Sequence, residues 1–463
     1  MAVKFNKIIL TVLAITIFLF LYFYPPMYGI MDEGEYLNTA FSLRKGSFFY
    51  DEVKVPPSTA TVITEKHQFS KYPPGNSILL VPFTSVHWKL GFLRTFLFFL
   101  GGFIIFYFLI KSYSIDPVFS LLYLLYPTLI LYSRTVMSDI PSMFFLLLGI
   151  FLIVKRKPCL AGFVFGFSII IRYTNAVAIF GVMLSYIIKR DYKSLLSLLP
   201  GIIFFILFNC VYNISILGGL LAPLVMPTGA TGFGISYIKT SGLFYIFALN
   251  LFYPCMLIIA IIYGLKKRNY LIFSIPSLLI LLVYSFYYYF DKGSFIFETV
   301  VRGGRFIIPV MPLILIIYAS FLNRSKFLRA AFVISIPLLL VLSAGIQIRH
   351  NQFLKDRVEI RNIIYDYTAD SDLIICNGEA GELISPFFGA KEWRDFYAER
   401  RVLLDTLEIK QSVSPFLVYV ESGKHPDELI GYRDSVVTLF NLDTIVVSES
   451  PQHTEIYKIL SLR

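Results

Sequence analysis

Long apolar runs, separated by short polar and basic segments, dominate this chain. A helix needs about 20 mainly apolar residues to cross a lipid bilayer. Runs near that length fall at roughly 8–24, 91–110, 116–133, 139–154, 195–217, 243–264, 270–289, 306–322 and 328–347. The pattern therefore predicts a multi-span α-helical membrane bundle.

One further apolar stretch, residues 158–188, is interrupted by the polar segment 172–175. One long tilted helix and a hairpin of two short spans both fit its length. Basic clusters flank it at 155–157 and 189–190, and cytoplasmic loops are enriched in Lys and Arg. If both clusters are cytoplasmic, the chain crosses twice with Arg172 at the outer turn, which gives about 11 spans in total.

This topology places the N-terminus inside and the C-terminus outside. The outer face then receives a large first loop, residues 25–90, a short turn with Arg134 and Asp139, and the polar stretches 218–242 and 290–305. The other face carries mainly Lys and Arg. An enzyme that acts on extracytoplasmic substrates is expected to segregate its polar residues in this way.

The composition changes at about residue 348, where the apolar runs shorten to the length of β-strands. Examples are 372–376, 416–420 and 444–447. Short apolar runs that alternate with helix-like segments predict a small α/β domain. We therefore expect a membrane bundle over 1–347, which includes the first outer loop, and an extracytoplasmic α/β domain over 348–463.

Composition fits a multi-pass membrane protein, which we expect in the plasma membrane. Of the 463 residues 57% are hydrophobic and 17% aromatic, and the mean hydropathy is +0.71. The net charge of +11 lies in short clusters between apolar runs, without a basic domain, so the expected partner is the lipid bilayer and no nucleic acid. The four cysteines suggest no disulfide framework.

The pair Asp32-Glu33 follows the first apolar run and is the most unusual polar feature of the chain. A carboxylate in a medium of low dielectric becomes protonated or finds a partner, so two adjacent ones at a membrane face need a reason. A solvated helix start, where Asp and Glu are common, is the alternative explanation. The position directly after the first span favours a functional role.

Three further motifs follow this pair along the chain. They are Lys71-Tyr-Pro-Pro-Gly75 at the return to the membrane, Arg134 with Asp139-Ile-Pro141, and Arg305-Phe-Ile-Ile-Pro-Val-Met-Pro312. In this order the four motifs resemble the GT-C superfamily of membrane glycosyltransferases, in the branch of protein O-mannosyltransferases and aminoarabinose transferases. The resemblance covers 1–347 and extends loosely to the tail. Many relatives have a basic residue directly before Pro-Pro, where this chain has Tyr72.

The resemblance implies a polyprenyl-phosphate sugar donor and an acceptor hydroxyl on an extracytoplasmic glycan, lipid or protein of the cell envelope. Sugar transfer to a hydroxyl needs a base that takes the acceptor proton. Asp32 is the candidate, and Glu33 is expected to bind the acceptor or orient Asp32. The departing phosphate needs cations. The expected phosphate-binding residues are Lys71, Arg305, Arg302 and Arg172, and the expected substrate-binding residues are Tyr72, Asp139, Arg134 and Glu35.

No cofactor is expected, because the five histidines are scattered without metal-ligand spacing; a divalent metal is the less favoured alternative. A metal-dependent oligosaccharyltransferase would show a Trp-Trp-Asp-Tyr-Gly segment, whereas the only tryptophans here are Trp88 and Trp393. A transporter or flippase of lipid-linked sugars would show internal repeats and polar residues at mid-membrane depth. A non-catalytic scaffold stays open, and the sequence leaves the sugar, the acceptor, the oligomeric state and the role of 348–463 open.

Overall fold

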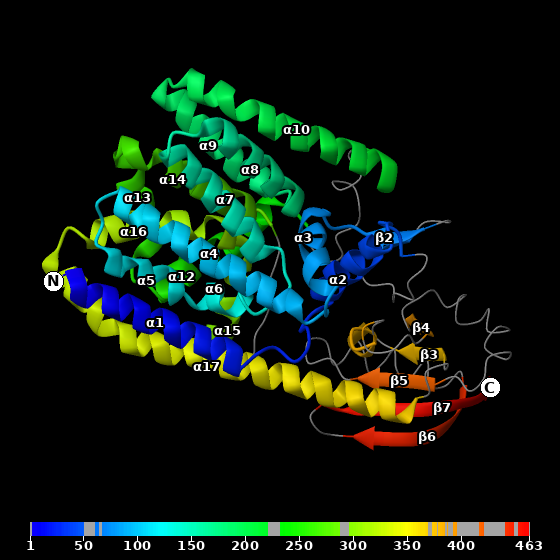
Figure 1. The fold of residues 1–463 in the computed structure, drawn as a ribbon. Coiled ribbons are helices and arrows are strands. Elements are labelled where there is room, and N and C mark those ends of the chain that lie inside the picture. Colours follow the sequence, from blue (N-terminus) through cyan, green and yellow to red (C-terminus); the bar gives the residue numbers. More distant parts are fainter. Residues whose placement is uncertain are drawn as a thin grey trace. The chain divides into compact units, whose positions relative to one another are not determined.

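The computed structural model is mainly helical, with a small sheet formed by the C-terminal residues (Figure 1). The parts of the chain that it describes are residues 2–50, 61–63, 67–220, 232–287, 296–368, 373–376, 378–384, 387, 392–395, 416–420, 440–448 and 452–462.

The chain divides into two compact units. The helical unit comprises Met1–Tyr24, Pro73–Leu80 and Leu90–His350, and the loop–sheet unit comprises Pro25–Tyr72, Val81–Lys89 and Asn351–Arg463. Each unit is described by itself below. The first loop thus shares a unit with the C-terminal residues, which no pattern in the sequence indicates.

Most helices belong to the helical unit, and two of them, α3 and α17, continue into the loop–sheet unit from Val81 and from Asn351. The α-helices are α1 (Ala2–Tyr22), α3 (Gly75–Thr84), α4 (Leu90–Ser112), α5 (Leu121–Leu124), α6 (Pro127–Tyr132), α7 (Asp139–Val154), α8 (Pro158–Ile171), α9 (Asn175–Lys189), α10 (Tyr192–Ile216), α12 (Leu243–Leu251), α13 (Met256–Lys266), α14 (Leu271–Ser285), α15 (Ile296–Gly303), α16 (Met311–Leu322) and α17 (Lys326–Tyr367). Short 3₁₀ or π turns join them: η1 (Pro117–Ser120), η2 (Ile235–Tyr237), η3 (Ile238–Gly242), η4 (Arg268–Tyr270) and η5 (Gly304–Val310).

Five helical segments of the described chain are long and apolar enough to cross a membrane, or six if one bent pair counts as a span. The five are Leu90–Ser112, Tyr192–Ile216, Arg268–Ser285, Thr299–Leu322 and Lys326–Tyr367. Several shorter apolar helices accompany them. The bundle predicted from the apolar runs is confirmed at this level, and the count of about 11 spans stays a prediction.

Residues 158–188 form two helices, α8 and α9, as the hairpin alternative predicts. Helix α8 starts with Pro158. At the first position of a helix the backbone N–H has no partner within the helix, so its absence in proline costs no hydrogen bond. The helix ends at Ile171, the next residue Arg172 has an extended backbone (φ −153°, ψ 114°), and α9 begins at Asn175. The break places the polar residues between two apolar helices instead of inside one.

Two predicted single spans are wrong in detail. The run 243–264 is two helices, α12 and α13, within a pair of segments bent by 95°, because Pro254 cannot continue a helix. The run 116–133 is broken into η1, α5 and α6, and prolines stand at the first positions of η1 and α6. In the run 116–133, proline at the first position of each new helix explains the interruption.

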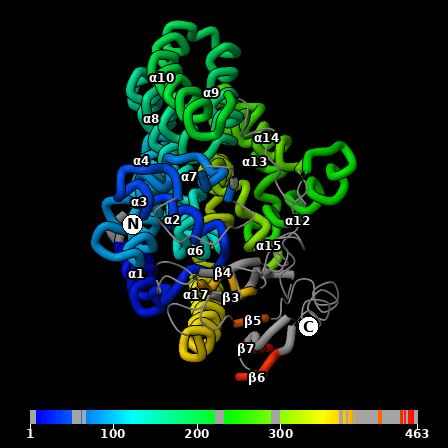
Figure 2. The backbone as a smooth tube through the Cα atoms, turned by 90° about the vertical axis from the view of Figure 1, so that its right-hand side faces the viewer, coloured from blue at the N-terminus to red at the C-terminus, as the bar shows by residue number. Residues whose placement is uncertain are grey.

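Glycines let α8 and α10 pack closely in the helical unit. A Cβ atom on Gly162 would lie 2.1 Å from the backbone oxygen of Leu198, and one on Gly201 would lie 2.2 Å from the backbone nitrogen of Phe163. Small residues at such crossings allow membrane helices to touch through their backbones. Figures 1 and 2 show α8, α9 and α10 side by side.

In the loop–sheet unit the five-stranded sheet has the order β4-β3-β5-β7-β6. Strand β3 (Leu373–Cys376) runs parallel to β4 (Glu392–Asp395) and β5 (Phe416–Val420), and β7 (Thr454–Leu462) is antiparallel to β5 and β6 (Phe440–Ser448). In register, Ile374 pairs with Phe416 and Leu417 with Tyr457. The small sheet domain predicted for the C-terminal part is thus present.

The rest of this unit comes mainly from the first loop. It contributes α2 (Met31–Arg44) and a small antiparallel pair, β1 (Thr61–Ile63) with β2 (Gln68–Ser70). Met27 is fully buried in one core cluster with Ile360 and Ile364 of α17 and with Ile374 of the sheet, and Trp88 packs against that cluster. The first loop and the C-terminal domain therefore share a hydrophobic core.

Candidate active site

Asp32 and Glu33 lie in the first turn of α2. The first turn of a helix favours carboxylates, because the helix dipole and the unpaired N–H groups are positive there. Ile30 precedes the helix in an extended conformation and offers no side-chain cap. Glu33 folds back instead: its Oε1 accepts a hydrogen bond of 2.9 Å from the N–H of Gly29, and its side chain is buried.

Two residues predicted for the site, Tyr72 and Lys71, come together with Asp32 in the loop–sheet unit. The hydroxyl of Tyr72 donates a hydrogen bond of 2.7 Å to Oδ1 of Asp32. The Tyr72 ring stacks on Tyr36 with 5.0 Å between centroids, and Nζ of Lys71 lies 5.9 Å from the Tyr72 centroid. Burial lowers the pKa of the Lys71 ammonium, against the opposing charges of Asp32 and Glu35.

Glu35 is held by hydroxyl groups of its own unit. Oε2 accepts 2.9 Å from the hydroxyl of Tyr50, and Oε1 accepts 2.6 Å from Oγ1 of Thr61. Burial and the neighbouring Glu35 raise the pKa of Tyr50 well above its usual range, so that phenol stays a donor. The carboxylate thus ties α2 to two later parts of the first loop, and its contact with substrate stays a prediction.

A second group of predicted residues lies in the helical unit around Asp139, the first residue of α7. The Asp139 side chain is completely buried, and its Oδ1 forms an ion pair with Nη1 of Arg172. Nε of Arg305 lies 3.9 Å from Oδ2 of the same carboxylate. The two arginine side chains are 11% and 13% exposed. One buried carboxylate therefore faces two partly accessible guanidinium groups, and the three charges sum to +1.

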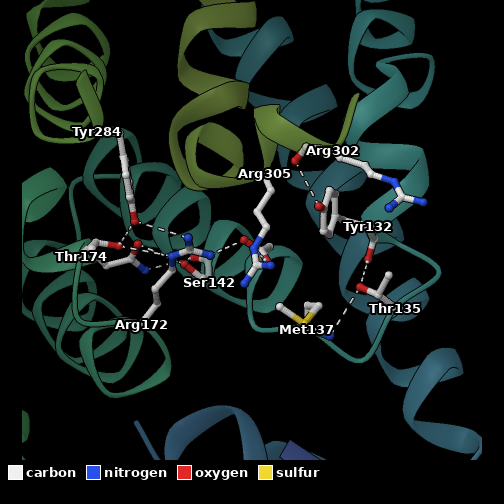
Figure 3. Close-up of polar contacts among 11 residues, drawn as sticks. Tyr132, Thr135, Met137, Ser142, Arg172, Thr174, Tyr284, Arg302 and Arg305 are labelled. Carbon is white, nitrogen blue, oxygen red and sulfur yellow. Dashed lines mark hydrogen bonds and ion pairs between the residues drawn. The ribbon is translucent and has the colours of Figure 1, made fainter. Parts of the chain in front are cut away.

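Aromatic and hydroxyl groups complete the surroundings of Arg172. Its Nη2 donates 3.3 Å to the hydroxyl of Tyr284, and its Nε donates 3.3 Å to Oγ1 of Thr174 (Figure 3). The guanidinium carbons of Arg172 and Arg305 lie 5.4 and 5.2 Å from the centroid of the Phe306 ring. Such cation–π contacts add to the ion pairs.

The sequence did not single out Tyr284, Thr174 or Phe306. Phe306 directly follows Arg305, so an aromatic ring next to a site arginine was the available signal for a cation–π partner. Tyr284 has no such signal, because it lies 112 residues from Arg172 in the sequence. Only tertiary packing brings these two together.

Arg302 and Arg134 differ from the other predicted cations. The Arg302 side chain extends away from those of Arg172 and Arg305 (Figure 3), and its backbone oxygen accepts 3.1 Å from the hydroxyl of Tyr132. Arg134 is fully buried and donates to Oε1 of Gln347 (3.2 Å), to Nδ1 of His350 (3.4 Å) and to the backbone oxygen of Phe23. These contacts join three parts of the helical unit, and substrate roles for both arginines stay predictions.

Arg94 is a buried arginine that the sequence did not single out. It contacts α3, the helix that follows Pro73-Pro74. Arg94 of α4 donates 2.6 Å to Oδ1 of Asn76 in α3 and 3.2 Å to the backbone oxygen of Val136. Nδ2 of Asn76 donates 3.1 Å to the same oxygen. The available signal was a lone arginine inside the apolar run 91–110, since intramembrane charges are rare without a role. The network fixes the segment that leads into Asp139.

Among the residues that the structure describes, no group of three or more His, Cys, Asp or Glu side chains is arranged to hold a metal ion. The expectation that no cofactor is needed stays a prediction.

No protein-family model and no curated protein sequence matches the chain. Among solved structures, ArnT from Cupriavidus metallidurans, an aminoarabinose transferase bound to undecaprenyl phosphate, aligns with a TM-score of 0.64 and 11% sequence identity, covering 98% of both chains. Its apo state aligns with a TM-score of 0.61 at 11% identity, over 98% of this chain and 97% of ArnT. This chain has the GT-C fold.

The GT-C fold confirms the resemblance inferred from the four motifs. With the apolar helices, it makes the chain a multi-pass membrane protein. At 11% identity the likeness to ArnT establishes the fold alone. An Archaeoglobus fulgidus oligosaccharyltransferase tethered to an acceptor peptide also aligns, over 88% of this chain and 68% of its own, at 12% identity. Its TM-score of 0.45 is too low to establish a shared fold.

Proposed function

We propose that this GT-C protein is a glycosyltransferase that moves a sugar from a polyprenyl-phosphate donor to an extracytoplasmic acceptor hydroxyl. The observation that carries the proposal is the Asp32 carboxylate, held by the Tyr72 hydroxyl at 2.7 Å with Lys71 beside it. The fold supports it, because ArnT, which shares the fold, has been seen with undecaprenyl phosphate bound. A lipid-linked donor keeps its phosphosugar head at the membrane surface, where a membrane enzyme can reach it.

Asp32 is the proposed general base. It takes the proton of the acceptor hydroxyl while that oxygen attacks the anomeric carbon of the donor sugar. The bond between the anomeric carbon and the phosphate oxygen breaks, and its electron pair leaves with the polyprenyl phosphate. The products are the glycosylated acceptor, the lipid phosphate and a proton on Asp32, which later passes to water.

Tyr72 and Glu33 are proposed to position this base. Tyr72 fixes the Asp32 carboxylate through its hydroxyl, and the stacked Tyr36 ring fixes Tyr72 in turn. Glu33 closes the first turn of α2 through the N–H of Gly29. A base whose carboxylate is held in one orientation loses less entropy in the reaction than one that rotates freely.

The proposed phosphate-binding cations are Lys71 in the loop–sheet unit and, in the helical unit, Arg172 and Arg305. Lysine offers a point charge, whereas arginine offers a planar fork that matches phosphate oxygens. Asp139 neutralises one of the two arginine charges and contacts both guanidinium groups. The remaining charge of +1 suits the developing charge on the leaving phosphate.

The decisive experiment for the function incubates the purified protein with a panel of polyprenyl-phosphate hexoses and pentoses and candidate acceptors. Sugar transfer, with release of polyprenyl phosphate, is the expected result, and the panel identifies the sugar. A parallel assay follows the same donors in liposomes. Movement of intact donor across the bilayer without consumption would show that the protein is a transporter of lipid-linked sugars and not a glycosyltransferase.

A further inference from the structure

We infer that the C-terminal α/β domain is a positioning element for the catalytic base, acting on the first turn of α2 through Arg357, Glu382 and Tyr28. The inference rests on the proposed function, since it assumes that Asp32 is the base. All the residues involved belong to the loop–sheet unit. It assigns a role to a domain whose sequence shows no motif of its own.

We use the word relay for the chain of contacts from Arg357 through Glu382 and Tyr28 to the first turn of α2; it carries no proton. It starts at a partly buried ion pair. Nη2 of Arg357, on α17, lies 2.8 Å from Oε2 of Glu382, just after the short helix α18 (Gly378–Gly381). The two side chains are only 9% and 16% exposed. The backbone oxygen of Glu382 accepts a hydrogen bond of 2.8 Å from the hydroxyl of Tyr28. The ion pair thus fixes the residue whose carbonyl holds Tyr28.

Tyr28 in turn contacts the first turn of α2. A Cβ atom on Gly34 would lie 3.6 Å from the Tyr28 ring, so the bare glycine backbone packs beside that ring. The next residue after Tyr28 is Gly29, whose N–H donates to Glu33. Asp32 lies between Gly29 and Gly34 in the sequence. The first turn of α2, which carries the base, is therefore held by the hydrogen bond between Gly29 and Glu33 and by the packing of Gly34 on Tyr28.

Helix α17 supports the same turn from a second direction. A Cβ atom on Gly29 would lie 3.2 Å from Phe353 and 3.2 Å from Leu354. That spacing is tight enough that only glycine fits without displacement of the neighbours. Met27, fully buried against the core of the sheet, and Trp88, edge-on to Tyr28 at 6.3 Å, fix the segment further.

This arrangement fits a positioning role better than simple attachment of a domain. Attachment requires only the apolar core around Met27, whereas the polar relay ends on the turn that carries Asp32. A base acts only within hydrogen-bond reach of the proton that it takes. A shift of about 1 Å at a reacting group can lower a rate about 100-fold.

The test uses Tyr28→Phe and Arg357→Gln in the full-length protein, since both keep most of the packing. We expect kcat to fall about 10-fold in each, with the KM for donor nearly unchanged. The unfolding temperature should stay near that of the wild type for Tyr28→Phe and should drop for Arg357→Gln, which removes the ion pair with Glu382. Arg357→Lys should recover part of the rate. Lys355→Gln, on an exposed position of the same helix, and Tyr367→Phe are the matched controls and should keep full activity.

A combination with Asp32→Asn separates positioning from a general structural effect. If the relay acts through Asp32, neither Tyr28→Phe nor Arg357→Gln lowers the residual rate of Asp32→Asn any further. Wild-type rates for both single variants, or an equal fractional loss in the Asp32→Asn background, would overturn the inference. Full activity of Asp32→Asn alone would instead refute the base, which is a failure of the proposed function and not of the relay alone.

Discussion

The hydroxyl of Tyr72 donates a hydrogen bond of 2.7 Å to Oδ1 of Asp32, 40 residues earlier in the chain. Tyr72 stands where the resemblance to the GT-C superfamily leads us to expect a basic residue directly before Pro-Pro. Here the tyrosine contacts the carboxylate, and Lys71, one residue earlier, brings the positive charge. Under the proposed function, Tyr72 positions the base and the neighbouring Lys71 binds the phosphate.

Tyr72→Phe tests the first of these tasks. The variant keeps the ring that stacks on Tyr36 and removes only the donor to Asp32. A hydrogen bond to a charged group contributes about 1.5–3 kcal/mol, so we expect kcat to fall about 10- to 100-fold with a nearly constant KM. Tyr367→Phe is the exposed control. An unchanged kcat would show that the Asp32 carboxylate needs no help from Tyr72.

The pH dependence of donor binding tests Lys71. Burial lowers the pKa of its ammonium, so the positive charge is present below that pKa and is lost as the pH rises through it. Donor affinity should therefore decline at a lower pH than for an exposed lysine. Lys71→Arg should move this alkaline decline upward, because arginine stays protonated. The measurement is the KM for donor from neutral to alkaline pH; identical profiles would remove Lys71 from donor binding.

Asp139→Asn tests the counter-ion of Arg172 and Arg305. Removal of one partner from a buried ion pair leaves an uncompensated charge, so we expect a loss of about 3 kcal/mol in the free energy of unfolding. The control is Asp116→Asn, which breaks a 3.2 Å pair with Arg329, a side chain that is 30% exposed. Thermal unfolding in detergent should show the larger loss for Asp139→Asn. The reverse order would contradict the account of a buried counter-ion.

Gly162→Ala tests the close packing of α8 on α10. The added Cβ would lie 2.1 Å from the backbone oxygen of Leu198, a contact that only a shift of the two helices can relieve. We expect a clear drop in unfolding temperature. Gly345→Ala, on α17 with nothing within 4 Å of its Cβ, should be neutral or should stabilise by up to about 1 kcal/mol. Equal effects of the two substitutions would argue against the tight crossing.

The apolar runs predicted many helices because lipid and protein interiors both select apolar residues. The run 195–217 corresponds to α10, and Arg172 indeed marks the break between α8 and α9. Bends were harder to foresee: the 95° angle in the pair of segments that holds α12 and α13 depends on Pro254 and on neighbours distant in sequence. Run length alone says nothing about such angles.

The sequence predicted those parts of the candidate site whose residues are close in sequence or belong to one loop. Asp32, Lys71 and Tyr72 belong to the first loop, and the structure brings them together. Two partners of Arg134, Gln347 and His350, lie more than 200 residues away, so no local pattern indicates them. The shared core of the first loop and the C-terminal domain was hidden for the same reason.

The measurement that most directly tests the central claim compares donor consumption by the wild type and by Asp32→Asn. Loss of the base should lower kcat about 10²- to 10⁴-fold, while donor binding and the unfolding temperature stay close to wild type. Asp366→Asn, an exposed carboxylate near the end of α17, is the matched control and should keep full activity. A wild-type rate for Asp32→Asn would contradict the account, because the proton of the acceptor would then need another base.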